Sequence, residues 1–122
     1  MYRLWIFLGS LAGLTAVAME AAAAHALGPR IGANGLALVH SATQMQGWHA
    51  LALVLCGVWA ERRRGRLVNL AGLAFALGII GFCGSLYLLA FYGLRLPSIA
   101  PIGGSLLMLG WLLLGLSALW RG

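Results

Sequence analysis

The sequence predicts an all-α membrane protein, a four-transmembrane-helix antiparallel bundle with both termini cytoplasmic. Apolar residues make up 62% of the 122 positions and charged residues only 8%, whereas a soluble domain carries about 25% charged residues. The apolar residues fall in four runs, and a helix of about 20 residues crosses a bilayer. Helices are expected because lipid offers open backbone no hydrogen-bond partner. A chain of this length should form a single membrane domain, residues 1–122.

The four runs predict helices over about residues 4–27, 40–60, 67–91 and 99–120. The first begins like a cleavable signal peptide, but its apolar stretch is longer than a signal core, so we expect a retained helix. Residues 28–35 are rich in glycine, with one proline and one asparagine, and predict a loop. Residues 36–43 fit either a short interfacial helix or the start of the second helix.

The later connections are predicted at residues 61–66 and 92–98. Pro97 and Pro101 bracket the start of the last helix, where proline is tolerated.

The arginines predict the orientation in the membrane. With four spans, both termini and the second connection share one side. That side would hold six arginines: Arg3, Arg62, Arg63, Arg64, Arg66 and Arg121. The other side would hold Arg30 and Arg95. Positive loops stay in the cytoplasm, so both termini are expected inside. The cluster at 62–66 is either this topology signal alone or also a site for anionic lipid headgroups.

Small residues recur at helical spacing and predict where the helices pack, because membrane helices associate by close backbone approach. The glycines expected at these contacts are Gly9, Gly13, Gly78, Gly81, Gly103 and Gly110. Helix two offers a weaker set with Gly47, Ala50 and Gly57. The Gly9–Gly13 pair could also mark a homodimer face, although a contact within the chain is the simpler use.

Charge and cysteine content exclude several functions. The net charge of +6 does not indicate nucleic-acid binding, because no basic face that could follow phosphates is present. Cys56 and Cys83 lie in separate apolar runs and form no metal or redox motif. The histidines show no zinc-site spacing, and a haem between His25 and His49 would rest on two residues alone. We expect no metal and no cofactor.

Four segments are similar to a known membrane family, the domain of unknown function 423, which includes transmembrane protein 256-like members. They are Ala24-His25-Ala26-Leu27, Gln46-Gly47-Trp48-His49-Ala50-Leu51, Gly84-Ser85-Leu86-Tyr87, and Pro101-Ile102-Gly103-Gly104 followed by Gly110-Trp111. The resemblance covers about residues 8–119. Glu20 and Gly47 depart from the pattern. The resemblance implies a small protein of the bacterial inner membrane without an established activity.

Polar residues at membrane depth form the candidate site, because an ionisable group there needs a partner or a function. The predicted cluster comprises Glu20, His25, Gln46, His49, Ser85 and Tyr87. We expect Glu20 to pair with His49 or Tyr87, and His40 to be interfacial. The cluster either carries a function or only fixes the order of the helices through hydrogen bonds. No nucleophile motif or oxyanion donor set accompanies Ser85 and His49, so we expect no enzyme.

Two functions remain. Short loops and glycine-rich faces favour a non-catalytic accessory or structural subunit, which contacts the lipid bilayer and either a larger membrane complex or further copies of itself. The alternative is a small transporter or channel that uses Glu20 and His49. A transporter should enclose a water-accessible cavity around Glu20, whereas a contact protein should be packed there.

Overall fold

The computed structural model describes residues 2–63 and 65–119, and every regular element in these residues is helical. The elements are α1 (Tyr2–Ala22), the π-helical turn η1 (Ala23–Leu27), α2 (Gly28–Arg62), α3 (Arg66–Tyr92) and α4 (Ile99–Leu119). Three segments are long and apolar enough to cross a membrane, namely Tyr2–Arg62, Arg66–Tyr92 and Ile99–Leu119. The all-α part of the predicted fold class is confirmed.

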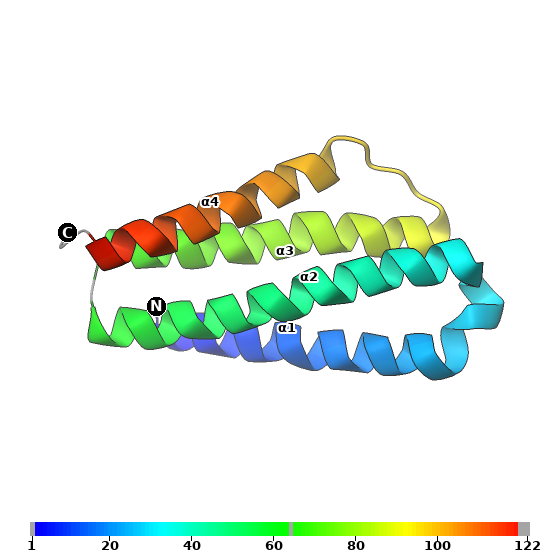
Figure 1. Ribbon diagram of the computed structural model, residues 1–122, viewed down its shortest axis with the longest axis horizontal. Coiled ribbons are helices and arrows are strands. Elements are labelled where there is room, and N and C mark those ends of the chain that lie inside the picture. Colours follow the sequence, from blue (N-terminus) through cyan, green and yellow to red (C-terminus); the bar gives the residue numbers. More distant parts are fainter. Residues whose placement is uncertain (1, 64, 120–122) are drawn as a thin grey trace.

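The segment Tyr2–Arg62 folds back on itself, so that α1 and α2 lie side by side (Figure 1). The prediction of a loop at residues 28–35 is wrong. The chain stays helical through these residues, and only Gly32 (φ 73°, ψ −178°) has a non-helical backbone. Such a positive φ is readily available to glycine alone. Residues 36–43 are continuous with α2 and form no separate interfacial helix. Helix two thus begins well before residue 40.

The remaining connections lie close to their predicted positions. Helix α2 ends at Arg62 and α3 begins at Arg66, while residues 93–98 join α3 to α4. Gly93 ends α3 in the left-handed conformation (φ 65°), and its N–H donates to the carbonyl of Leu89 at 3.0 Å. Glycine commonly ends helices in this way because it lacks a Cβ. The chain then runs along an extended path to α4 (Figure 1).

Helix α2 packs against both α1 and α3, while α4 packs mainly against α3. The main core surrounds Trp5, Leu53, Phe75 and Leu107, which are almost fully buried. Large apolar side chains also cover the outside, for example Val17, Leu51 and Ile80, each more than 70% exposed. An apolar outer surface of this extent is unfavourable in water and suits contact with lipid.

Glycines allow the helix backbones to approach closely at most of the predicted positions. A Cβ on Gly9 would lie 2.7 Å from the carbonyl oxygen of Ala50, and a Cβ on Gly103 would collide with the backbone of Phe82. Gly78 and Gly110 face Leu107 and Phe75 equally closely, and a Cβ on Gly81 would lie 3.3 Å from the Cα of Gly103. Gly13 differs, because a Cβ there would make only an ordinary contact of 3.8 Å with Ala50.

The weaker glycine set on helix two behaves unevenly. Gly57 packs tightly against the start of α1, whereas a Cβ on Gly47 would meet nothing within 4 Å. Gly72 is a tight contact that the small-residue pattern missed, because the indole of Trp5 lies directly over it.

The helices differ in length. From Ala33 to Arg62, α2 is about 45 Å long at about 1.5 Å per residue. Helix α4, with 21 residues, is about 31 Å long on the same measure. It begins short of the end where η1 and the tip of α3 lie (Figure 1).

Candidate functional site

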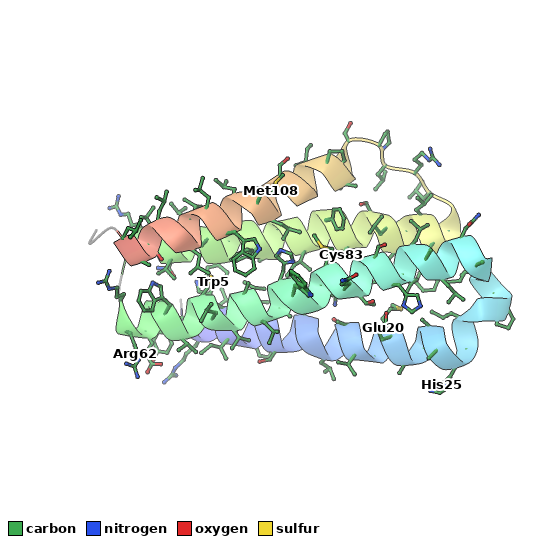
Figure 2. All side chains as sticks on the ribbon, in the orientation of Figure 1. Trp5, Glu20, His25, Arg62, Cys83 and Met108 are labelled. Atoms are coloured by element: carbon green, nitrogen blue, oxygen red, sulfur yellow. The ribbon has the colours of Figure 1, made fainter. Side chains whose placement is uncertain are left out.

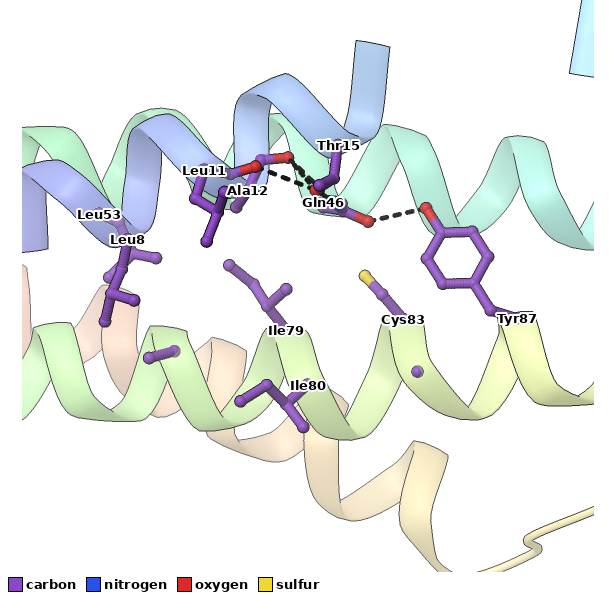
Figure 3. Close-up of a pocket in the computed structure, with 12 residues that line it drawn as sticks. Leu8, Leu11, Ala12, Thr15, Gln46, Leu53, Ile79, Ile80, Cys83 and Tyr87 are labelled. Atoms are coloured by element: carbon purple, nitrogen blue, oxygen red, sulfur yellow. Dashed lines mark hydrogen bonds between the residues drawn. The ribbon is translucent and has the colours of Figure 1, made fainter. Parts of the chain in front are cut away.

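Gln46 is the centre of a polar cluster that connects α1, α2 and α3 (Figure 3). It is 6% exposed. Its Nε2 donates to the carbonyl of Ala12 at 2.9 Å and to Oγ1 of Thr15 at 2.6 Å. Its Oε1 accepts from the hydroxyl of Tyr87 at 2.7 Å. Of the six residues predicted to cluster, Gln46 and Tyr87 are thus in direct contact.

Glu20 does not pair with His49 or Tyr87, so that prediction is wrong. Its carboxylate lies 2.8 Å from Nδ1 of His40 and accepts a short hydrogen bond from the hydroxyl of Thr43. The side chains of Glu20 and His40 are about half exposed, at 45% and 56%. Glu20 and His40 lie closer to η1 along α1 and α2 than Thr15 and Gln46 do. His40, expected to be interfacial, is thus the acid's partner.

The discrepancy has a physical cause. In an antiparallel pair, residues opposite each other are equally far from the reversal point, and the reversal lies near residue 30. Glu20 therefore faces His40, just as Thr15 faces Gln46. The sequence prediction began helix two at residue 40. That start moves the residues of helix two by about two turns relative to helix one, and so it placed His49 wrongly at the level of Glu20.

His49 belongs to a separate aromatic group within the core. Its Nδ1 lies 2.5 Å from the carbonyl of Met45, and its Nε2 lies 3.0 Å from Nε1 of Trp111. The indole can only donate, so Nε2 accepts and Nδ1 carries the proton. Both nitrogens of a neutral ring are then satisfied. Phe75 and Trp111 pack against the imidazole, with ring centroids 5.7 and 5.8 Å away.

The other predicted cluster members lie apart. The buried hydroxyl of Ser85 donates to the carbonyl of Phe82 on its own helix at 2.9 Å. His25 is exposed on η1, at the end of the molecule (Figure 2). The predicted cluster of six is therefore split into Gln46 with Tyr87, Glu20 with new partners, His49 in the core, and two single residues.

Three arginines of the predicted cluster are described at the α2–α3 connection. Arg62, Arg63 and Arg66 are all exposed, and the guanidinium of Arg63 lies 5.6 Å from the ring centroid of Trp59. Arg64 and Arg121 lie outside the described residues.

Sequence reasoning missed several polar partners. Thr15 and Thr43 join α1 to α2, and Trp111 connects α4 to His49. In addition, Nε1 of Trp5 donates to Oδ1 of Asn69 at 2.9 Å, and Nε1 of Trp59 donates to Ser117 at 3.1 Å. Tryptophan and threonine in apolar runs resemble ordinary lipid-facing residues. Only the requirement that a buried N–H or O–H finds a partner could have drawn attention to them.

The polar groups bond chiefly to one another. Within the described part of the chain, every buried side-chain nitrogen and oxygen has a hydrogen-bond partner. A network that is fully satisfied in this way fixes helix order and rotation. Beside Gln46 lies a cavity of about 460 Å³, lined mostly by apolar side chains from α1, α2 and α3 (Figure 3). Glu20 and His49 do not line it.

These features define a small all-helical membrane protein with a hydrogen-bonded interior and an apolar exterior. A family model described as "Protein of unknown function (DUF423)" matches residues 19–104. The chain belongs to this family, as its motifs predicted. No solved structure matches it.

Similar proteins cover nearly the whole chain. The UPF0382 membrane protein of Staphylococcus aureus (strain bovine RF122 / ET3-1) is 40% identical, over 92% of each chain. A UPF0382 membrane protein of Staphylococcus haemolyticus is 37% identical, over 94% of each chain. The UPF0382 inner membrane protein YgdD of Escherichia coli (strain K12) is 31% identical, over 96% of this chain and 90% of the relative.

Proposed function

We propose that this protein is a non-catalytic accessory subunit of a complex in the bacterial cytoplasmic membrane. It spans the bilayer four times, and both termini are in the cytoplasm. The segment Tyr2–Arg62 supplies two spans, because α1 and α2 run antiparallel beside each other. The start of α1, the α2–α3 connection and the end of α4 lie at one end of the molecule (Figure 1). The relative YgdD, named as an inner membrane protein, supports the choice of membrane.

The observation that carries the accessory role is the contrast between interior and exterior. Inside, the polar side chains bond to one another. Outside, large apolar side chains such as Phe7, Leu51 and Ile102 cover the helices. Short connections leave little chain outside the bilayer. Such a molecule acts through contacts within the membrane, with lipid and with other helices.

The position of Glu20 also favours contact over transport. A transporter that used this acid would need a water-accessible cavity around it. The cavity of about 460 Å³ lies elsewhere and is lined mainly by apolar side chains. Glu20 is held by His40 and Thr43, and these bonds resemble a link between α1 and α2 more than an open binding site.

The direct test is to recover the native assembly. The chain, tagged in its chromosomal copy, would be extracted into a membrane-mimicking polymer, and the intact assembly would be weighed by native mass spectrometry. We expect a fixed stoichiometry with a larger membrane protein. Recovery as a monomer or a homo-oligomer alone would contradict the accessory role.

A matched pair of variants locates the contact. Leu51→Ala and Val17→Ala each shorten a side chain that is over 70% exposed, on α2 and α1 respectively. If one of these faces holds the partner, the corresponding variant reduces co-purification and the other does not. Neither should alter the fold, because exposed truncations cost little stability.

A further inference from the structure

A cleft opens sideways between α1 and α3, and α2 forms its floor (Figure 3). Its volume of about 460 Å³ is within the range of about 300–1,000 Å³ found for small-molecule sites. Leu11, Thr15 and Ile80 line it and are exposed on the outer surface. The cleft is therefore open in the direction from which a lipid molecule would enter.

The cleft is about as long as one leaflet of a bilayer. Along α1 it extends from Leu8 to Thr15, and along α3 from Ala76 to Tyr87. At about 1.5 Å per residue these spans are about 10 and 16 Å long, roughly half of the 30 Å hydrocarbon core. A partner helix that crossed the membrane would need a groove of the full length. One lipid chain fits the observed length.

Polarity changes along the cleft. Thr15, Gln46 and Tyr87 lie at one end, and Leu8, Leu53 and Ala76 at the other. Tyr87 is five residues before the end of α3, about 8 Å along the axis. Thr15 and Gln46 lie near the middle of α1–η1 and of α2. The polar end therefore extends from the middle of the molecule toward the η1 side, and the apolar end lies toward the α2–α3 connection. A lipid chain with one small, uncharged polar group matches this distribution.

The hydrogen bonds determine which polar group fits. Both Nε2 hydrogens of Gln46 are donated, to Ala12 and Thr15, and the hydroxyl of Tyr87 donates to Gln46 Oε1. Thr15 donates to carbonyls of its own helix, and the thiol of Cys83 donates to the carbonyl of Ala42. Every hydrogen-bond donor at the polar end is therefore already used, whereas the oxygens of Tyr87 and Thr15 keep lone pairs that can accept a further hydrogen bond.

We propose that the cleft binds one neutral, single-chain lipid whose polar end is a hydroxyl, in the class of long-chain alcohols and monoacylglycerols. The hydroxyl donates to the phenol oxygen of Tyr87 or to Oγ1 of Thr15. A carbonyl group would fit less well, because Tyr87 would have to turn its hydrogen away from Gln46 and leave a buried amide oxygen without a donor. A charged headgroup would meet no counter-charge, since no lining residue is charged.

The test compares two probes that differ only in the hydroxyl hydrogen. One is hexadecanol with a photoreactive diazirine in mid-chain, and the other is its methyl ether. Both are added to the whole protein in nanodiscs of phosphatidylethanolamine and phosphatidylglycerol. We expect the alcohol to label cleft residues of α1 and α3 at least tenfold more than the ether. Equal labelling by the two probes would overturn the proposal.

Two glycine variants separate binding in the cleft from labelling elsewhere. Gly84 lines the cleft and Gly115 does not, and a Cβ at either position meets nothing within 4 Å. Gly84→Phe should fill the cleft and abolish labelling by the alcohol, whereas Gly115→Phe should leave labelling unchanged. Unchanged labelling in Gly84→Phe would overturn the site.

A third and a fourth variant keep the test decisive if Gly84→Phe does not fold. The triple variant Thr15→Val, Gln46→Leu and Tyr87→Phe removes both proposed acceptors and the amide oxygen that Tyr87→Phe alone would leave free, so it should erase most of the preference for alcohol over ether. Ile80→Trp enlarges an exposed lining side chain without touching a hydrogen bond, and it should reduce labelling by both probes. If neither variant changed the labelling, the proposed site would be wrong.

Discussion

At the residue scale, Gln46 shows how one buried amide can link helices by hydrogen bonds inside a membrane protein. Its Nε2 donates two hydrogen bonds to α1 and its Oε1 accepts one from α3, so that one side chain of α2 links three helices. Reversing the amide would place its oxygen against the carbonyl of Ala12, so the surroundings fix its orientation. The sequence indicated Gln46 and Tyr87 as polar residues of similar depth, because both stand in apolar runs. It could not indicate Thr15, whose hydroxyl resembles that of any threonine in a helix.

The Gln46–Tyr87 contact should be measurable as a coupling energy. The variants Gln46→Leu, Tyr87→Phe and the double variant form a thermodynamic cycle, read by reversible unfolding in mixed micelles. Hydrogen bonds between membrane helices average about 0.6 kcal/mol and reach about 1.7 kcal/mol. We expect a value near the upper figure, because Gln46 is buried and, among the described residues, Tyr87 Oη is the only side-chain donor to its Oε1. Strict additivity of the two single variants would show that the contact contributes nothing.

At the element scale, the helices were predictable and their register was not. Apolar runs of bilayer length located α3 and α4 within a few residues. The turn between α1 and α2 was misplaced because glycine, proline and asparagine indicate a break without showing how short it is. Here a π-helical turn and one left-handed glycine suffice. That error alone assigned the wrong partners to Glu20.

The glycines of α4 offer a test of close helix packing. A Cβ on Gly103 would collide with the backbone of Phe82, whereas a Cβ on the adjacent Gly104 would lie 3.7 Å from the ring of Phe82. Gly103→Ala should therefore destabilise the protein by about 1–3 kcal/mol, as overpacking does. Gly104→Ala should be neutral or stabilising, because alanine favours helix by about 1 kcal/mol over glycine. Unfolding curves with equal midpoints for the two variants would contradict the packing between α3 and α4.

At the scale of the whole molecule, the proposed topology follows from charge. Among the described residues, Arg3, Arg62, Arg63 and Arg66 lie at the end opposite η1, against Arg30 and Arg95 at the other. Reporters that are active only in the cytoplasm should work when fused at either terminus and fail when inserted at residues 93–98. Changing Arg62, Arg63, Arg64 and Arg66 to asparagine should raise the share of inverted molecules, since it removes most of the charge bias. A reporter that stayed active at residues 93–98 would refute this orientation.

The unequal helix lengths affect the bilayer around the protein. Helix α2 is long enough to exceed a hydrocarbon core of about 30 Å, whereas α4 just matches it. At the η1 end, α1 and α2 extend beyond the start of α4 (Figure 1), and the exposed face of α2 there carries His40, Ser41 and Gln44. These polar side chains suit the headgroup layer better than the hydrocarbon. The protein should therefore present a polar ledge to the lipid headgroups along the flank of α1 and α2, and headgroup chemistry would influence which neighbours it meets there.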